Sequence, residues 1–276
     1  MALDPGEALA RLTDAFRARG SVLVAFSGGV DSAVLAKVGH DALGARSLAV
    51  IVDSESYARE EKEAAEGFAR ALGIPFETVF HSELSDPRYA ANPVDRCYFC
   101  RDGLSRATKE IAAARGFAAV AVGTNVSDLS EWRPGKRALD EHGMWQPYLE
   151  LGMDKQDVRA LARHLALPVW DKPSMACLSS RIPHGEPVTM EKLTRIGHAE
   201  TALRRRGFRQ VRVRTVEGGA RARVEVLPEE IPRLDAMLPE VARELRALGY
   251  AEVEIDPKGY RAGSLTEGLR VLPASR

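Results

Sequence analysis

The chain has 276 residues, of which 45% are hydrophobic and 28% charged, so it is long enough for one large or two ordinary globular domains. Its 39 basic and 39 acidic residues balance to zero formal charge, which argues against general electrostatic binding to nucleic acid or to an anionic membrane. No apolar run reaches transmembrane length, residues 1–20 have the pattern of an amphipathic helix, and three cysteines do not make a disulfide framework. These properties predict a cytoplasmic protein.

Short β-type runs alternate with stretches of helix length between residues 21 and 125. The runs read SVLVAF, SLAVIVD, PFETVF and AAVAVG, and most are apolar throughout. Such runs are typical of strands that are buried on both faces of a parallel sheet. We therefore predict an α/β fold with a doubly wound, mostly parallel sheet, in which ligands bind beyond the carboxyl ends of the strands.

The pattern changes after about residue 185. A helical stretch over 189–206 precedes two alternating runs, RQVRVRTV and ARARVEVL, and a helical stretch over 229–248 precedes AEVEID. Alternation indicates strands with one solvent-exposed face. We predict two domains, an α/β domain over residues 1–184 and a small α+β domain over residues 185–276.

The stretch AFSGGVDSAV, residues 25–34, joins the first strand to the helix that follows it. Two adjacent glycines allow main-chain N–H groups to converge, and a helix start adds unpaired amides and the positive end of its dipole. The stretch matches neither G-x-x-x-x-G-K-[ST] nor G-x-G-x-x-G, so a hydride-transfer cofactor is not indicated. It predicts a phosphate site, with simple helix capping as the alternative.

Polar residues also follow two other strands of the predicted sheet. Asp53 ends the second strand, and Asp128 and Arg133 lie in GTNVSDLSEWRPGKRA after the fourth. Aspartate is a hard oxygen ligand suited to Mg²⁺, and arginine neutralises phosphate. Helix capping by Asp53 and an ordinary solvated loop around Asp128 are the alternatives.

The three cysteines form a candidate metal site. Cys97 and Cys100 stand three residues apart in CYFC, so a helix or turn directs both sulfurs the same way, and Cys177 lies far along the chain in SMACLSSRIPHG. Three thiolates with one open position suit an iron–sulfur cluster. Zinc with a histidine as fourth ligand, or cysteines buried as small apolar residues, are the alternatives. The candidate histidines are His81, His142 and His184.

Arginines are concentrated at the start of the C-terminal domain. Arg212 and Arg214 share one strand face by the two-residue alternation, and Arg221 and Arg223 extend that face on the next strand. The guanidinium fork fits phosphate oxygens, whereas a basic face kept for solubility is the alternative. Between residues 201 and 216 the arginines are Arg204, Arg205, Arg206, Arg209, Arg212 and Arg214.

The SGGVDS string between a strand and a helix resembles the pyrophosphate loop of the ATP pyrophosphatase (PP-loop) superfamily, whose members cleave ATP between its α and β phosphates and adenylate a substrate. The resemblance implies an adenine nucleotide alpha hydrolase-like domain that uses ATP, with Asp31 helping to hold Mg²⁺ and Asp53 where the superfamily holds adenosine. Preorganised N–H donors, hydroxyls and a metal ion stabilise the charge on departing pyrophosphate. By the resemblance, it is held by Ser27, Gly28, Gly29, Val30, Asp31 and Ser32.

Together SGGVDS, GTNVSDLSEWRPG and PSMACLSSRIPHG resemble the LarE family, over most of the chain. LarE proteins are ATP-dependent sulfur transferases that serve the nickel-pincer nucleotide cofactor of lactate racemase. The resemblance implies adenylation of a carboxylate of pyridinium-3,5-biscarboxylic acid mononucleotide and its conversion to a thiocarboxylate. In the single-cysteine form, the residue matching Cys177 attacks the acyl adenylate, gives up its own sulfur and becomes dehydroalanine.

This sequence departs from the single-cysteine pattern by adding Cys97 and Cys100. Three-cysteine members resemble enzymes that hold a 4Fe-4S cluster and deliver a cluster-bound sulfide. Because a cysteine bound to iron is a poor candidate for losing its sulfur, we predict catalytic transfer from a cluster held by Cys97, Cys100 and Cys177. Sulfur from Cys177 itself is the alternative, and the sulfide donor is not identified.

The same resemblance assigns the substrate phosphate to the C-terminal half. Ser180, Arg212 and Arg214 are expected to bind it, with Glu200 nearby and Arg181 as a neighbour. The family assembles as a homo-oligomer with sites near subunit contacts, so the prediction includes self-association, a mononucleotide substrate and neither membrane nor nucleic acid as partner.

Three other classes of function stay open on the sequence. A tRNA thiolase of the same superfamily also joins adenylation to cysteine or cluster chemistry, but the zero net charge and the lack of an added RNA-binding module count against it. An amide-forming ligase such as an NAD or GMP synthetase has no need of CYFC or CLSSR. A nucleotide sensor is least favoured, because firm pyrophosphate binding serves little purpose without cleavage.

Overall fold

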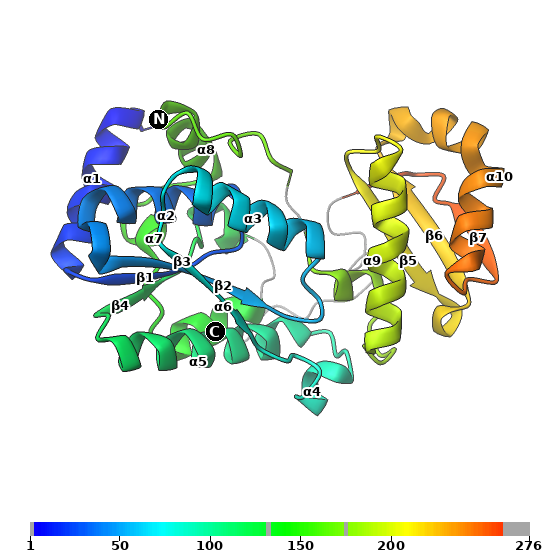
Figure 1. Ribbon diagram of the computed structural model, residues 1–276, viewed down its shortest axis with the longest axis horizontal. Helices are drawn as coiled ribbons and strands as arrows, with labels where there is room; N and C mark the ends of the chain where they lie inside the picture. The colour runs from blue at the N-terminus through cyan, green and yellow to red at the C-terminus, as the bar shows by residue number, and fades with distance from the viewer. Residues whose placement is uncertain (1–2, 131–133, 174–175, 262–276) are drawn as a thin grey trace. The chain divides into compact units, whose positions relative to one another are not determined.

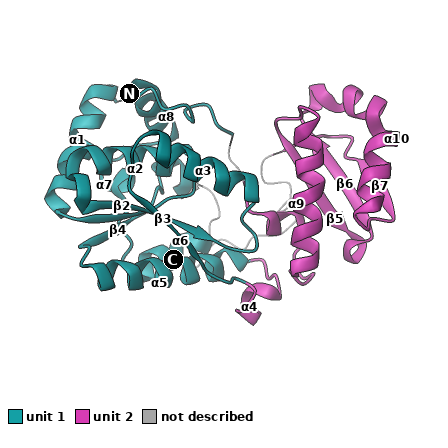
Figure 2. Ribbon diagram, in the orientation of Figure 1, with its two compact units in different colours: residues 1–83, 95–175 teal, residues 84–94, 176–276 magenta. Residues whose placement is uncertain are grey.

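The computed structural model describes residues 3–130, 134–173 and 176–261 (Figure 1). Backbone contacts divide the chain into two compact units: unit 1 comprises residues 1–83 and 95–175, and unit 2 comprises residues 84–94 and 176–276 (Figure 2). The predicted assignment of separate roles to residues 1–184 and 185–276 stays a prediction. No helix of the described residues is long and apolar enough to cross a membrane.

Unit 1 is built on a four-stranded sheet whose paired strands are all parallel. Its strands occur in the order β3-β2-β1-β4. Most residues of the short β1 and the longer β2 are apolar and buried, on both faces of the sheet. The strands are β1 (Val22–Ala25), β2 (Ser47–Asp53), β3 (Phe76–Phe80) and β4 (Ala119–Ala121).

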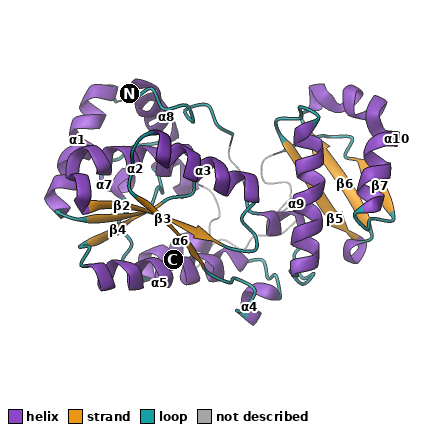
Figure 3. Cartoon of the chain, in the orientation of Figure 1, coloured by secondary structure: helices purple, strands orange, loops and turns teal. Residues whose placement is uncertain are grey.

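Helices cover both faces of this sheet (Figure 3). Because side chains alternate along β1, Val22 and Val24 pack into one apolar cluster, with α1, α2, α3 and α8, whereas Leu23 packs into a second cluster on the α5 side. The doubly wound α/β fold predicted from the sequence is thereby confirmed. The helices are α1 (Pro5–Arg19), α2 (Val30–Leu43), α3 (Arg59–Ala71), α5 (Arg96–Arg115), α6 (Pro134–Glu141), α7 (Pro147–Glu150) and α8 (Lys155–His164).

Unit 2 contains a small mixed sheet together with two long helices, which is the α+β composition expected of the C-terminal region. Strand β6 pairs antiparallel with β5 and parallel with β7, and an apolar cluster joins the sheet to its two long helices. The expectation of a solvent-exposed face was wrong for β5, because Arg212 and Arg214 are each only 8% exposed. The elements are α4 (Pro87–Ala90), α9 (Met190–Arg205), β5 (Val211–Val216), β6 (Arg221–Val226), α10 (Ile231–Ala247) and β7 (Glu252–Ile255).

The segment 84–94 joins unit 2 through polar contacts with residues 179–188. The Asn92 amide donates to the carbonyl oxygens of Pro183 and Glu186, at 2.8 and 2.9 Å, and the Tyr89 hydroxyl lies 2.6 Å from that of Ser179. Tyr89 and Asn92 are both buried. These contacts explain why a short excursion between β3 and α5 belongs to the C-terminal unit.

Candidate functional site

The predicted phosphate loop connects the carboxyl end of β1 to the first turn of α2, where parallel α/β sheets bind ligands. Gly28 has φ +66°, and a Cβ placed there would lie 2.7 Å from the Cβ of Ala65 on α3. Both the left-handed backbone and the close approach therefore require glycine. Gly29 is the residue before α2, and no side-chain hydrogen bond from the described residues caps this helix start.

Three consecutive carbonyl oxygens of the loop accept hydrogen bonds from the protein. The Tyr57 hydroxyl donates to the oxygen of Ser27, at 3.1 Å, and the Lys172 ammonium donates to that of Gly28, also at 3.1 Å. The Gly29 oxygen accepts from the Ser32 hydroxyl and from a helix amide. The carbonyl side of the loop is thus satisfied internally, while the first amides of α2 keep no partner within the helix.

Tyr57 remains a proton donor over the whole physiological range. Burial, followed by the negative charges of Glu61 and Asp53, raises the pKa of its phenol well above the ordinary value. Lys172 has its ammonium 2.7 Å from the Glu61 carboxylate in addition to its contact with Gly28. The loop is therefore bordered by one fixed neutral donor and one charged donor.

Asp31, in the first turn of α2, lies in a network that also contains the predicted Asp128. One Asp31 oxygen accepts from the Asn125 amide at 3.2 Å and the other pairs with Lys155, while an Asp128 oxygen accepts from the Asn125 backbone at 3.0 Å. A Cβ on Gly123 would lie 2.8 Å from that of Asp31, so glycine permits this close approach of the β4 end to α2.

The two carboxylates suit a magnesium ion that is shared with a nucleotide. Mg²⁺ prefers oxygen ligands and commonly takes one or two carboxylates, several waters and substrate phosphates. No group of three or more His, Cys, Asp or Glu residues arranged for a metal ion occurs within residues 3–130, 134–173 and 176–261. The donor chemistry of Asp31 and Asp128 fits, and Mg²⁺ binding stays a prediction.

Tyr148 supports Asp31 through a backbone contact. Its hydroxyl donates to the Asp31 backbone oxygen at 2.7 Å, and its side chain is fully buried. Burial, with a smaller contribution from Asp31, raises the pKa of the Tyr148 phenol well above its ordinary value. A protonated phenol therefore holds the first turn of α2.

Asp53 and Arg133 have different outcomes. Asp53 ends β2 as predicted, but its carboxylate pairs with Lys62 of α3 at 2.8 Å, and its expected contact with adenosine stays a prediction. Arg133 lies outside the described residues.

The cysteines are divided between the two units. Cys97 and Cys100 lie on the first two turns of α5 in unit 1, which confirms their helical spacing, whereas Cys177 directly precedes a short 3-10 helix, Leu178–Arg181, in unit 2. None of the three forms a disulfide. The meeting of the three thiols stays a prediction.

Of the histidines considered for zinc, His142 has a ring nitrogen 2.7 Å from Asp102, and His184 has one 3.1 Å from the Pro93 oxygen.

The residues predicted to bind substrate phosphate come together in unit 2. Arg181, 1% exposed, donates to both oxygens of Glu200, at 2.6 and 3.0 Å, and to the Ser180 hydroxyl at 2.9 Å. Arg214 donates to the Ser180 backbone oxygen at 2.9 Å and pairs with the buried Glu225. The strand register puts Arg221 and Arg223 on the same sheet face as Arg214, as predicted.

Arg212 is the member of this cluster best suited to meet an anion. Its guanidinium lies over the Tyr260 ring, 4.5 Å from the centroid, and donates to the phenol oxygen at 3.2 Å. Burial lowers the pKa of Arg212, and the positive charges of Arg181 and Arg214 lower it further. A desolvated cation beside two like charges favours binding of a negative group.

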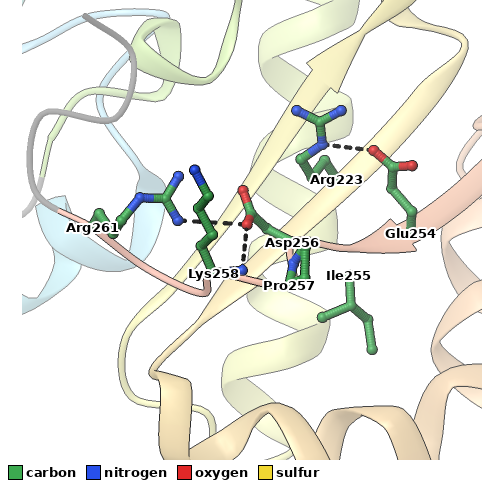
Figure 4. A pocket seen from close by; sticks show the side chains of 7 residues that line it. All are labelled: Arg223, Glu254, Ile255, Asp256, Pro257, Lys258 and Arg261. Atoms are coloured by element: carbon green, nitrogen blue, oxygen red, sulfur yellow. Dashed lines mark hydrogen bonds and ion pairs between the residues drawn. The ribbon is translucent and has the colours of Figure 1, made fainter. Parts of the chain in front are cut away.

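A pocket with a volume of about 410 Å³ opens beside β7 in unit 2 (Figure 4). Two of its cations are already paired, Arg223 with Glu254 at 2.6 Å and Arg261 with Asp256 at 3.5 Å. Lys258 is the third cation of the lining, and a single lysine on the surface does not define a ligand, so we assign none to the pocket.

Several contacts of the site involve residues that no sequence motif indicated. Lys172 meets a loop 144 positions earlier in the chain, and Lys155 and Tyr148 meet Asp31 across similar separations. Asn125 had a usable signal, because it lies within GTNVSD at the end of β4. The lysines had none, since a single lysine on a polar surface is common.

A parallel sheet with a glycine-bearing loop between β1 and an uncapped helix start is typical of nucleotide-binding proteins, and the SGGVDS sequence of this loop is that of the PP-loop class. A family model described as NAD synthase matches residues 10–88, the part that contains this loop. Pyridinium-3,5-bisthiocarboxylic acid mononucleotide synthase of Lactiplantibacillus plantarum is 35% identical over 249 residues, which cover 90% of each chain. The chain belongs to the LarE family.

Two further relatives extend over similar lengths. An uncharacterized protein of Synechocystis sp. is 43% identical over 249 residues, or 90% of this chain and 92% of the relative. An uncharacterized protein of Methanocaldococcus jannaschii is 22% identical over 241 residues, or 87% and 91%. The family predicted from the three motifs is confirmed, and ATP use follows from the PP-loop class.

Proposed function

We propose that this protein is an ATP-dependent sulfur transferase that converts a carboxylate of pyridinium-3,5-biscarboxylic acid mononucleotide to a thiocarboxylate, for the nickel-pincer cofactor of lactate racemase. The observation that carries the proposal is the phosphate loop at the carboxyl end of β1, with its carbonyl groups satisfied and its helix start uncapped. The identity to the Lactiplantibacillus plantarum synthase supports the choice of substrate.

The first step in this proposal is adenylation. A substrate carboxylate oxygen attacks the α-phosphorus of ATP, the bond from that phosphorus to the bridging oxygen breaks, and pyrophosphate leaves. Loop amides and the α2 dipole stabilise the charge that develops on the leaving group. Asp31 and Asp128 would hold a Mg²⁺ that neutralises the same charge.

The second step replaces AMP by sulfur. A carboxylate is a poor electrophile, whereas the acyl adenylate carries a good leaving group. A sulfur nucleophile attacks the acyl carbon, the bond from carbon to the AMP oxygen breaks, and AMP leaves with the electron pair. The thiocarboxylate forms directly from sulfide, or through a thioester to Cys177 whose Cβ–S bond then breaks by elimination.

The substrate phosphate is assigned to the arginine cluster of unit 2. Arg181, Arg204, Arg212 and Arg214 surround the two carboxylates of Glu200 and Glu225, which leaves two positive charges in excess among these six side chains. Arginine forks suit a phosphate monoester.

The proposed sulfur source is a 4Fe-4S cluster held by Cys97, Cys100 and Cys177, which when bound would supply sulfide not drawn from the polypeptide. The chain passes between the units at residues 94–95 and again at 175–176, so Cys97 and Cys177 both stand within three residues of a crossing. Segment 84–94 is also hydrogen-bonded to residues 179–188. Both facts limit the length of chain that separates Cys97 from Cys177.

The decisive experiment incubates the protein anaerobically with ATP, Mg²⁺, sulfide and the biscarboxylic acid mononucleotide. We expect release of AMP and pyrophosphate, and a thiocarboxylate product detected by mass spectrometry. Nicotinamide mononucleotide, which has no carboxylate to activate, is the matched control and should release neither. Formation of an amide from ammonia, or sulfur transfer to tRNA, would overturn the proposal.

The sulfur source is tested on the same samples. Iron and sulfide are measured after anaerobic reconstitution of the wild type and of Cys97→Ala, and we expect the variant to lose iron. An unchanged iron content would contradict the shared cluster. One product sulfur per chain, with Cys177 converted to dehydroalanine despite excess sulfide, would favour the sacrificial route.

A further inference from the structure

Orientation of the peptide groups decides whether the phosphate loop can bind an anion. In a planar trans peptide, the N–H of one residue points away from the C=O of the residue before it. The described residues contain no cis peptide bond. Holding the oxygens of Ser27, Gly28 and Gly29 therefore directs the N–H groups of the next residues, Gly28, Gly29 and Val30, to the opposite side.

We propose that Lys172 is a positioning residue of the phosphate loop, an inference that rests on the proposed function. Its ammonium holds the Gly28 oxygen and thereby directs the Gly29 N–H toward the pyrophosphate portion of ATP. Gly28 needs such a tie, because glycine has the widest conformational freedom and this peptide has no side chain on either flank. Lys172 is also largely buried, with 20% of its side chain exposed.

Lys172 supplies charge as well as geometry. An ammonium on the carbonyl side polarises the peptide and increases the positive character of its N–H. Glu61, 2.7 Å away, offsets part of that charge. The Tyr57 hydroxyl holds the Ser27 oxygen in a similar way, but it carries no charge.

The proposal predicts selectivity among nucleotide ligands. Pyrophosphate and ATP carry the groups that the loop amides meet, whereas AMP lacks the β and γ phosphates. Loss of the Lys172 tie should therefore weaken binding of pyrophosphate and ATP and leave that of AMP nearly unchanged. A lysine that merely stabilised unit 1 would affect all three ligands alike.

The test is calorimetric binding of pyrophosphate, ATP and AMP, each with Mg²⁺, to the full chain. We expect Lys172→Met to weaken pyrophosphate binding about ten-fold or more and AMP binding less than about two-fold, with Lys172→Arg close to wild type. Tyr57→Phe should cause a smaller loss of the same selectivity. Lys192→Met is the matched control, because Lys192 also contacts a carboxylate and a backbone oxygen, those of Glu186 and Pro187, in unit 2.

The Glu61→Gln variant separates positioning from simple structural support. Removal of the acid leaves the Lys172 charge undiminished, so pyrophosphate binding should equal or exceed that of the wild type. A loss similar to that of Lys172→Met, or equal losses of pyrophosphate and AMP in Lys172→Met, would overturn the role of Lys172. A wild type that binds neither ATP nor pyrophosphate would instead overturn the proposed function.

Discussion

The anion sites proposed for the two units use different kinds of chemistry. Unit 1 offers main-chain amides, whose carbonyl side is fixed by Tyr57 and Lys172, and it needs a glycine at one close contact. Unit 2 offers guanidinium groups that are already engaged with Glu200 and Glu225. An amide loop is sensitive to shape, whereas a paired arginine cluster is sensitive to charge balance. Substitutions of each kind therefore have different expected effects in the two units.

The largest effect on stability is expected from Glu200→Ala in unit 2. Glu200 is fully buried and accepts from Arg181, from Arg204 at 2.6 Å and from the Val213 amide at 3.1 Å. Its removal leaves buried cations uncompensated, which should cost about 3–5 kcal/mol. Circular dichroism should show an early melting transition.

Tryptophan fluorescence provides the contrast between the units. Trp145 and Trp170 belong to unit 1, so their signal should keep its original midpoint in Glu200→Ala. The control is Glu244→Ala, which breaks a partly exposed pair with Arg206 and should cost less than about 1 kcal/mol. Equal destabilisation by the two variants would show that burial of the Glu200 pair is unimportant.

The next effect is expected from Gly28→Ala in unit 1. The added Cβ meets Ala65 at 2.7 Å and the backbone is left-handed, so the loop must shift at a cost of about 2–3 kcal/mol. Binding of ATP, measured by calorimetry, should fall below detection. Gly73→Ala is the control, because Gly73 has φ +64° but no atom within 4 Å of the added Cβ. If both variants bind ATP normally, the close approach has no functional role.

The same contrast explains what the sequence revealed. SGGVDS was recognisable because glycine at a strand–helix junction has a local backbone cause, and the buried β1 and β2 runs indicated a parallel sheet. Arg212 and Arg214 were located correctly, but their burial was missed, since alternation along one strand does not reveal that Tyr260 and the Leu178–Arg181 turn cover it. Lys172 was missed because its partner is distant in sequence.

A smaller effect, confined to the substrate phosphate, is expected from Arg212→Lys. Lysine keeps the charge but loses the fork and the stacking on Tyr260, so affinity for the mononucleotide should fall about ten-fold. ATP binding in unit 1 should not change. Arg205→Lys, at an exposed position of α9, is the control and should match the wild type. Unchanged affinity of Arg212→Lys would remove Arg212 from the proposed phosphate site.

The smallest effect is a loss of stability at alkaline pH, which both units should share. Burial raises the pKa of Tyr148 in unit 1 and of Tyr250 in unit 2 above the ordinary value of 10.0. Above that pH the unfolded phenols release protons that the folded phenols retain, so the free energy of unfolding decreases as pH rises. Below pH 10 the phenols are protonated in both states, and their full contribution to stability is kept. Urea unfolding between about pH 8 and 11 should show this slope. Tyr148→Phe should reduce the slope of the tryptophan signal of unit 1, where Tyr57 still contributes, and leave the circular dichroism change of unit 2 as steep as before. An identical slope in both signals would contradict the assignment.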